Sequence, residues 1–148
     1  MRILVLNGPN LNLLGTREPE VYGTQTLDEL MEEVAHYGRE RGVDIDTAQA
    51  NGEGTLIDLL QGAVSRYDGV VFNPGAYTHY SYALRDAIAS IPVPVVEVHL
   101  TDISQREEFR QVSVTAPVCI AQHSSGGVTS YLQGIDTLMA YRADASQR

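Results

Sequence analysis

The sequence predicts a doubly wound α/β fold, in which a parallel sheet of five strands lies between two layers of helices. Short apolar runs rich in β-branched residues alternate with segments whose apolar residues recur at helical spacing, and this alternation repeats along the chain. The run at 69–72 is apolar throughout, which is typical of a parallel strand that is buried on both faces. The simplest sheet with this order of elements is flavodoxin-like, with a three-layer α/β/α arrangement.

Each element is expected from its own pattern. The strands are expected at residues 2–6, 43–48, 69–72, 93–98 and 116–121. Thr26 and Glu29 have the spacing of a capping box, so a helix is expected from there to Gly42. Further helices are expected at 56–63, 79–91 and 128–139, with a short helical segment at 105–109. The small, polar tail from Ala143 is expected to fray.

Length and composition limit the kinds of protein that this chain can be. Its 148 residues, 43% of them hydrophobic, suffice for one domain with a full core, so we expect a single catalytic domain over 1–148. The formal net charge of -9 argues against a nucleic-acid surface, which needs a basic patch. All ten basic residues are arginines, and without a lysine no side chain can form a Schiff base.

The sequence contains no signal for secretion or for a membrane. The apolar run at 3–6 is too short for a signal peptide, and no run approaches the ~20 apolar residues of a membrane span. The one cysteine, Cys119, has apolar flanks, which favour a small buried side chain over a reactive thiol. A reducing, cytoplasmic location is therefore expected, with no nucleic-acid or membrane partner.

Polar and titratable residues follow the ends of the first four predicted strands. In a doubly wound sheet, ligands bind beyond the carboxyl ends of the strands. The segments at these ends are 7–10 (Asn-Gly-Pro-Asn), 49–54 (Gln-Ala-Asn-Gly-Glu-Gly), 73–79 (Asn-Pro-Gly-Ala-Tyr-Thr-His) and 97–101 (Glu-Val-His-Leu-Thr). A binding site is therefore expected at this edge of the sheet.

Several kinds of cofactor site are excluded by missing motifs. The sequence has no dinucleotide-binding glycine motif after the first strand, no phosphate-binding P-loop and no nucleophile elbow. The four histidines (36, 79, 99 and 123) lack the spacing of metal ligands, so neither a metal nor a cofactor is expected. What remains is acid–base chemistry by Tyr, His and Arg side chains on a small polar or anionic substrate.

The main alternative is a non-catalytic flavodoxin-like module that binds a flavin or accepts a phosphate. A flavin site needs a Ser/Thr-rich phosphate loop after the first strand, where this chain has Gly8 and Pro9. A phosphate receiver needs paired acids near the first strand and a lysine late in the chain, and neither is present. An enzyme is therefore favoured.

Three blocks of sequence resemble one enzyme family, the type II dehydroquinate dehydratases. The opening block is Asn7 to Pro19 with Tyr22-Gly23, the second is 73–79 with 83–87, and the third is 97–100 with 106–110. The likeness extends from the first strand to about Ala121. Tyr80, Tyr82 and Ser104 depart from the family pattern, at positions that bear on subunit contacts and loop shape rather than on the reaction.

The resemblance implies a hydro-lyase that eliminates water from 3-dehydroquinate, through an enolate, to give 3-dehydroshikimate. It implies no cofactor, a place in the shikimate pathway of aromatic amino acid biosynthesis, and a homododecamer built as a tetramer of trimers. The type I enzymes perform the same reaction through a lysine Schiff base, which this lysine-free chain cannot form.

The resemblance also implies the catalytic residues. Tyr22 is expected to be the base, with its pKa lowered by Arg17, and Asn10 to hold a water at the enolate oxygen. His99 is expected to be the general acid, oriented by Glu97, which lies two residues earlier and so on the same face of the strand. Without the motif, Tyr22 would be read as a packing residue and His99 as a satisfied polar residue.

The remaining expected contacts are with the substrate. They are Asn73, His79, Arg110, the backbone N–H groups of Leu100 and Thr101, and Asp86 from a neighbouring subunit. Arg106 is expected to be structural or at the edge of the site, and without the motif Arg110 could equally be a solvated helix charge. The segment from Leu14 to Gly23 is expected to close over the substrate as a lid.

Overall fold

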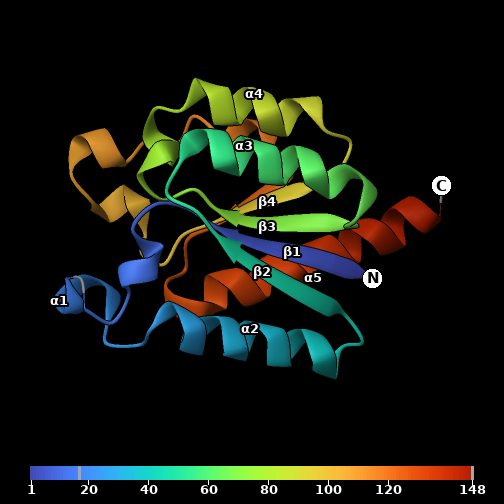
Figure 1. The fold of residues 1–148 in the computed structure, drawn as a ribbon, viewed down its shortest axis with the longest axis horizontal. Helices are drawn as coiled ribbons and strands as arrows, with labels where there is room; N and C mark the ends of the chain where they lie inside the picture. Colours follow the sequence, from blue (N-terminus) through green and yellow to red (C-terminus); the bar gives the residue numbers. More distant parts are fainter. Residues whose placement is uncertain (17, 148) are drawn as a thin grey trace.

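The computed structural model describes residues 1–16 and 18–147, although not the side chains of residues 21 and 22. Its centre is one parallel sheet of five strands: β1 (Arg2–Asn7), β2 (Asp44–Gln49), β3 (Gly69–Asn73), β4 (Val95–Val98) and β5 (Ala121–His123). The strand order is β2-β1-β3-β4-β5 (Figure 1), which is the flavodoxin-like order. The predicted fold class is therefore confirmed.

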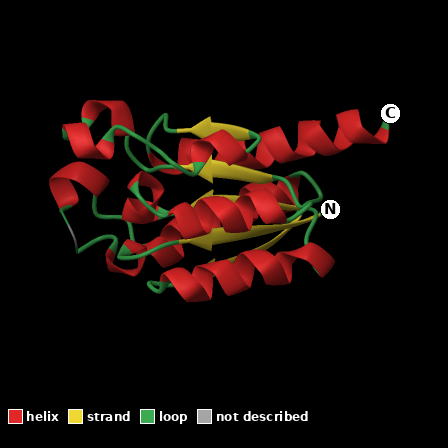
Figure 2. Ribbon diagram, turned by 90° about the horizontal axis from the view of Figure 1, so that it is seen from above, coloured by secondary structure: helices red, strands yellow, loops and turns green. Residues whose placement is uncertain are grey.

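Helices cover both faces of the sheet. The helices α3 (Glu53–Gly62) and α4 (Tyr82–Ser90) lie on one face, and α2 (Leu27–Glu40) and α5 (Gly127–Ser146) lie on the other (Figures 1 and 2). Thr26 caps α2 as expected, because its Oγ1 accepts a hydrogen bond of 3.1 Å from the N–H of Glu29. A short helix, α1 (Pro19–Tyr22), lies between β1 and α2.

The strands divide the apolar residues between two cores because successive side chains point to opposite faces. In β1, Ile3 and Val5 pack with α2 and α5, whereas Leu4 and Leu6 pack with α3 and α4. The strand β3 is buried along its whole length. Each fully buried side chain of this size stabilises the fold by about 1.5–3 kcal/mol, so β1 and β3 form a rigid base for the residues at their ends.

The fifth strand lies later than expected. Residues Ala116–Val118 form a turn of 3-10 helix, and the strand begins only at Ala121, so the predicted strand at 116–121 was wrong. The reason is Pro117, which has no N–H for the ladder and a backbone angle suited to a helical turn. The predicted run of apolar residues therefore packs as a turn rather than as a strand.

Three helix boundaries also differ from expectation. The expected helix at 79–91 is split, because Gly75–His79 is a 3-10 turn and Ser81 caps α4 by accepting a hydrogen bond of 3.0 Å from the N–H of Leu84. The segment around 105–109 is two 3-10 turns, Ile103–Gln105 and Glu108–Arg110. The last helix continues through Ser146, beyond the expected start of fraying at Ala143.

Cys119 is only half-buried, not fully buried as expected. Its Sγ lies 3.4 Å from the carbonyl oxygen of Thr115. Burial, together with the charge of Glu97, raises the pKa of the thiol, so it stays protonated. The interpretation of Cys119 as an unreactive packing residue is consistent with this environment.

Candidate active site

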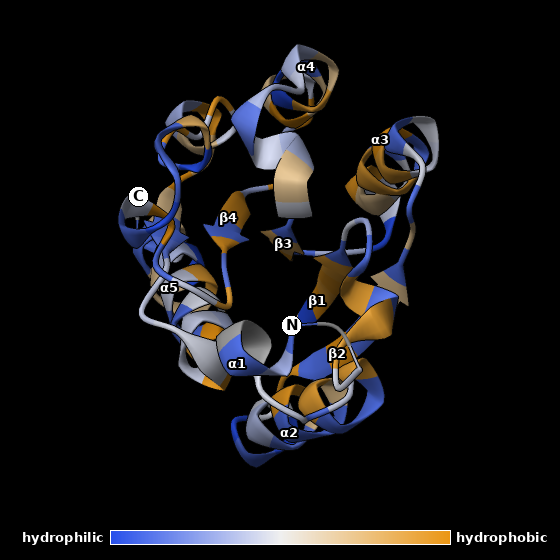
Figure 3. Ribbon diagram, turned by 90° about the vertical axis from the view of Figure 1, so that its left-hand side faces the viewer, coloured by the Kyte–Doolittle hydropathy of each residue, from blue (hydrophilic) through white to orange (hydrophobic). Residues whose placement is uncertain are grey.

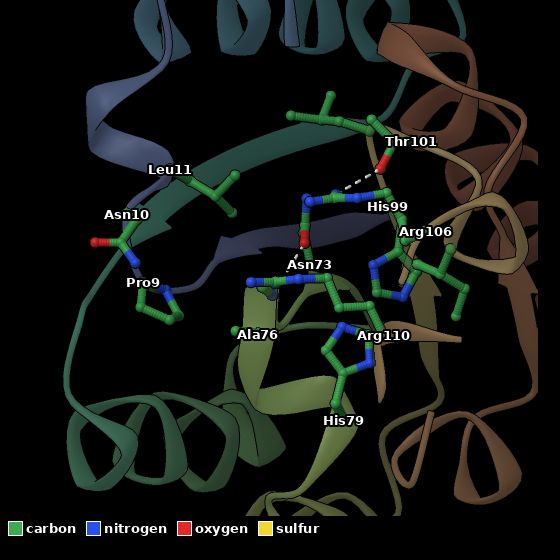
Figure 4. A pocket seen from close by; sticks show the side chains of 13 residues that line it. Pro9, Asn10, Leu11, Asn73, Ala76, His79, His99, Thr101, Arg106 and Arg110 are labelled. Carbon is green, nitrogen blue, oxygen red and sulfur yellow. Dashed lines mark hydrogen bonds between the residues drawn. The ribbon is translucent and has the colours of Figure 1, made fainter. Parts of the chain in front are cut away.

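The carboxyl ends of the strands meet at one edge of the molecule, and a pocket lies there. Figure 3 views the molecule from this edge. Three connections line the pocket, those that follow β1, β3 and β4 (Figure 4). The lining residues are Pro9, Asn10, Leu11, Asn73, Gly75, Ala76, His79, His99, Leu100, Thr101, Ile103, Arg106 and Arg110. The site therefore lies where the sequence predicts it.

The pocket contains most of the expected site residues that the structure describes. Asn10, Asn73, His79, His99, Leu100, Thr101 and Arg110 all line it. Glu97 lies directly behind His99, and Asp86 lies elsewhere, exposed on α4. Arg17 and the side chain of Tyr22 lie outside the described residues, so the expected base and its partner have no described geometry.

Glu97 and His99 form a buried pair at the end of β4. His99 Nε2 lies 2.8 Å from Glu97 Oε2, and the exposed fractions of the two residues are 5% and 0%. The two side chains meet because residues i and i+2 share one face of an extended chain. The two residues are therefore in direct contact, as their spacing on the strand predicts.

Glu97 is surrounded by hydrogen-bond donors. Its carboxylate also accepts hydrogen bonds from Ser113 Oγ at 2.8 Å, from Gln122 Nε2 at 2.7 Å and from Thr115 Oγ1. Burial alone would raise the pKa of Glu97, but the hydrogen bond and the charge of His99, with the bonds from Thr115 and Ser113, lower it in net. Glu97 is therefore an anion at neutral pH although it has no contact with water.

This anion determines how His99 can work. A carboxylate only accepts hydrogen bonds, so Nε2 of His99 must carry a proton and donate it to Glu97. The other ring nitrogen, Nδ1, makes no hydrogen bond to a described residue and is available to the pocket. A proton carried on Nδ1 would face the pocket, where it could pass to a bound molecule.

His79 presents the opposite capacity. Its Nδ1 lies 2.7 Å from the carbonyl oxygen of Val112, which can only accept, so Nδ1 carries a proton. Burial, and the neighbouring charges of His99 and Arg110, lower the pKa of His79 despite the bond to Val112. The neutral ring therefore has an unprotonated Nε2, which can accept a hydrogen bond from a hydroxyl group in the pocket.

Two arginines make the pocket cationic. Arg110 donates from Nε to Glu107 at 2.6 Å and lies over the ring of Phe109, which fixes its direction. Arg106 donates from Nη1 to Thr101 Oγ1 at 3.3 Å. Arg106 is also among the residues that line the pocket.

The turn after β4 supplies backbone donors. Within the described part of the chain, nothing accepts a hydrogen bond from the N–H groups of Leu100 and Thr101, and both residues line the pocket. Adjacent free N–H groups near two guanidinium groups suit a carboxylate. The site is built for a small anionic molecule that also carries hydroxyl groups.

Asn10, in the connection after β1, and Asn73, at the end of β3, contribute amide groups. Asn10 has a left-handed backbone (φ 70°), which Asn tolerates better than most residues, and its N–H donates to Asn51 Oδ1 at 3.1 Å. Asn73 is 3% exposed, and its Oδ1 accepts from the N–H of Gly75 at 3.1 Å. Neighbouring residues thus fix the backbone of Asn10 and the side-chain amide of Asn73.

Sequence reasoning missed several residues that support the site. Ser113, Thr115 and Gln122 hold Glu97, and Tyr131 holds Asn73. The first two lie in an irregular segment with no periodic pattern, and their role depends on contacts 16 and 18 residues away in the chain. Gln122 is exposed in the middle of β5 and lies outside the strand expected at 116–121, so no local pattern marks it either.

Neither a metal site nor a membrane helix is present in the part of the chain that the structure describes. Across residues 1–16 and 18–147, no three His, Cys, Asp or Glu side chains lie close enough together to hold a metal ion. No described helix combines the length and the apolar character needed to cross a membrane.

A histidine whose Nε2 donates to a buried carboxylate, in a pocket with two arginines at the carboxyl edge of a flavodoxin-like sheet, is typical of an α/β enzyme that uses side-chain acid–base chemistry. The family model for class II dehydroquinases matches residues 1–139, and the chain belongs to that family. The resemblance seen in the sequence motifs is thereby confirmed, and a non-catalytic module is not favoured.

Individual relatives agree with this assignment. The chain is 53% identical over 141 residues to the 3-dehydroquinate dehydratase of Carboxydothermus hydrogenoformans, covering 95% of this chain and 92% of that protein. It is 54% identical over 137 residues to the 3-dehydroquinate dehydratase of Bacillus pumilus, covering 93% of each. Among solved structures, the type II dehydroquinase from Butyrivibrio crossotus has a TM-score of 0.90 and 46% identity, over 93% of this chain and 97% of that one.

Proposed function

We propose that the chain is a 3-dehydroquinate dehydratase, a hydro-lyase that removes water from 3-dehydroquinate to give 3-dehydroshikimate in the shikimate pathway. The observation that supports this most directly is the buried Glu97–His99 pair, which opens into a cationic pocket in a chain of the class II dehydroquinase family. The absence of lysine from the sequence excludes a Schiff base on a side chain, and we propose that the reaction proceeds through an enolate, as the family resemblance implies.

The first step removes a proton from C2, next to the C3 ketone. We assign this role to Tyr22, because it is the tyrosine of the opening motif and Arg17 precedes it by five residues in the same loop. An ordinary tyrosine has a pKa of about 10, so a nearby guanidinium charge is needed to stabilise the phenolate near neutral pH. The electrons of the broken C–H bond move onto the C3 oxygen, where Asn10 would hold a water that donates to it.

The second step expels the hydroxyl group from C1 by anti elimination. His99 gives its Nδ1 proton to this hydroxyl, which leaves as water while the enolate electrons form the C1–C2 double bond. Glu97 keeps its negative charge throughout and stabilises the protonated ring before the transfer. The reverse reaction uses the same groups in the opposite order, with His99 as the base.

Binding uses the groups around this pair. The substrate carboxylate is assigned to the N–H groups of Leu100 and Thr101 and to the amide of Asn73. The ring hydroxyl groups are assigned to His79 Nε2, which accepts, and to Arg110, which donates. The segment from Leu14 to Gly23 is proposed to close over the bound molecule.

We also propose that the chain works in the cytoplasm as a homododecamer built from trimers. Tyr80, Tyr82, Phe109 and Val112 are 58–68% exposed, and their two segments touch where His79 binds the carbonyl of Val112. An apolar surface of this kind beside a site is typical of a subunit contact. Asp86 lies one turn after Tyr82 on α4, so a contact there would bring Asp86 toward the site of a neighbouring copy.

The reaction is tested by ultraviolet absorbance when purified protein is mixed with 3-dehydroquinate, with Tyr22→Phe as the control. The product has a double bond conjugated with its ketone, so absorbance should rise with wild type and not with the variant. No rise from folded wild-type protein would refute the proposed activity. A rise of similar rate with Tyr22→Phe would instead remove Tyr22 as the base.

A further inference from the structure

Tyr131 lies in the second turn of α5, yet its hydroxyl group reaches the carboxyl ends of β1 and β3. The residue is fully buried, with an exposed fraction of 0%. Its oxygen lies 2.9 Å from Asn73 Nδ2 and 2.6 Å from Asn7 Oδ1. We infer that Tyr131 is a positioning residue for the dehydration, which acts by aiming the amide of Asn73 into the pocket.

The directions of these hydrogen bonds are fixed by one backbone group. The N–H of Gly75 can only donate, so the atom of Asn73 that faces it must be the carbonyl oxygen Oδ1. The amide nitrogen of Asn73 therefore faces Tyr131 and donates to its oxygen. The hydroxyl proton of Tyr131 must then point to Asn7 Oδ1.

Asn7, at the end of β1, accepts the hydrogen bond from the Tyr131 hydroxyl group. Its amide nitrogen lies 3.3 Å from the sulfur of Met31, which leaves Oδ1 as the atom that receives the Tyr131 proton. Asn7 and Asn73 are paired residues on the neighbouring strands β1 and β3. Burial raises the pKa of Tyr131, so the hydroxyl keeps its proton. The two hydrogen bonds from Asn73 to Tyr131 and from Tyr131 to Asn7, called the relay below, therefore keep their directions.

The relay leaves one N–H of Asn73 unused. Oδ1 accepts from the N–H of Gly75 and one amide hydrogen is directed to Tyr131, so the second amide hydrogen has no partner among the described residues and can be offered to the pocket that Asn73 lines. That donor suits an oxygen of the substrate carboxylate or of the C1 hydroxyl. This inference rests on the proposed function, which assigns Asn73 to the substrate.

A purely structural role is the alternative, because the Tyr131 ring belongs to the core between the sheet and helices α2 and α5. Phenylalanine keeps the ring and removes only the hydroxyl group, so Tyr131→Phe separates the two roles. Tyr67→Phe is the matched control, since Tyr67 also loses a hydrogen bond, one of 2.7 Å to Asp46. Neither Tyr67 nor Asp46 lines the active-site pocket.

The experiment measures kcat and KM for 3-dehydroquinate with four variants: Tyr131→Phe, Asn73→Ala, the double variant and Tyr67→Phe. We expect Tyr131→Phe to lower kcat/KM about tenfold, as the loss of one oriented donor would, while Tyr67→Phe stays within about twofold of wild type. The double variant should match Asn73→Ala within about twofold, because Tyr131 has no route to the substrate once Asn73 is gone.

Each other outcome has a distinct meaning. Wild-type kinetics for Asn73→Ala would overturn the substrate role of Asn73 in the proposed function. A loss with Asn73→Ala but none with Tyr131→Phe would overturn the inference and leave the proposed function intact. The same holds if Tyr131→Phe lowers kcat/KM tenfold both in wild type and in Asn73→Ala. If Tyr131→Phe fails to fold, Asn7→Ala tests the same relay from its other end. It frees the hydroxyl proton to turn toward Asn73, and unchanged kinetics would again contradict the inference.

Discussion

At the scale of single residues, the site depends on keeping Glu97 charged without water. The sequence predicts the Glu97–His99 partnership, because two residues on one face of a strand need only local geometry to meet. It does not predict Thr115 or Gln122, whose contacts with Glu97 depend on how the chain folds across 18 and 25 residues. Local periodicity therefore finds the Glu97–His99 pair but not the residues whose hydrogen bonds stabilise the Glu97 carboxylate.

The pH dependence of stability follows from the lowered pKa of Glu97. A carboxyl group whose pKa is lower in the folded chain stabilises the fold above its unfolded pKa, and this stability is lost as the pH falls through the folded value. Thr115→Val removes one of the bonds that lower this pKa. We expect the free energy of unfolding to fall less between about pH 7 and about pH 3 in the variant than in wild type.

Chemical denaturation at the two pH values measures this difference. Thr137→Val is the control, because Thr137 is a hydroxyl residue on α5 whose partners are Gln133 and His123 rather than Glu97. The control should keep the pH dependence of wild type. If the free energy of unfolding of Thr115→Val changes with pH as much as that of wild type, Thr115 does not help to lower the pKa of Glu97.

At the scale of elements, the close approach of the loops after β1 and β3 shapes the pocket. The N–H of Gly8 donates to the carbonyl of Asn73 at 2.8 Å, and a Cβ added at Gly8 would lie 2.6 Å from the carbonyl oxygen of Pro74. That neighbour is backbone, so Gly8→Ala must push the two loops apart. We expect a loss of about 1–3 kcal/mol in the free energy of unfolding and a much lower kcat/KM.

Gly54→Ala is the matched control for this substitution. Gly54 lies in α3, where an added Cβ would meet no atom within 4 Å, so alanine should stabilise the helix by about 0.5–1 kcal/mol. Urea denaturation and the absorbance assay report both quantities. A Gly8→Ala enzyme as stable and as active as wild type would mean that the loops can separate freely.

The elements themselves were predicted well where their patterns are periodic. The strands β1 to β4 and the helix α2 lie close to their expected positions, because alternating or helical apolar spacing and the Thr26 cap are local signals. The fifth strand was misplaced for two reasons. Pro117 prevents the apolar run from forming a strand, and the true β5 has only three residues, which are partly exposed. Ser81 was not predicted as the cap of α4, because the residues directly after it show no helical spacing of apolar side chains.

At the scale of the whole molecule, the proposed assembly allows Asp86 to bind substrate in the site of a neighbouring copy, which a single subunit does not allow. Asp86 is exposed on α4 and does not line the pocket of its own chain. We expect Asp86→Ala to raise KM for 3-dehydroquinate about tenfold with kcat within about threefold, because a binding group from the neighbouring copy is lost. Asp58→Ala, an exposed aspartate on α3, should leave both constants unchanged.

Sedimentation must accompany this measurement, because the expected effect requires an intact assembly. Wild type and both variants should sediment with the mass of a dodecamer. Wild-type KM in dodecameric Asp86→Ala would exclude Asp86 from the site, and a monomeric wild type with full activity would refute the need for a neighbouring copy.

In the proposed mechanism, His99, oriented by Glu97, delivers the proton that releases water. The most direct test is the rate of absorbance increase from 3-dehydroquinate with His99→Ala, compared with His36→Ala. His36 is an exposed histidine on α2 that pairs with Glu40, far from the pocket lining. We expect kcat to fall by about a hundredfold or more in His99→Ala and to stay within about twofold of wild type in His36→Ala. A His99→Ala enzyme with near-normal kcat would contradict this mechanism.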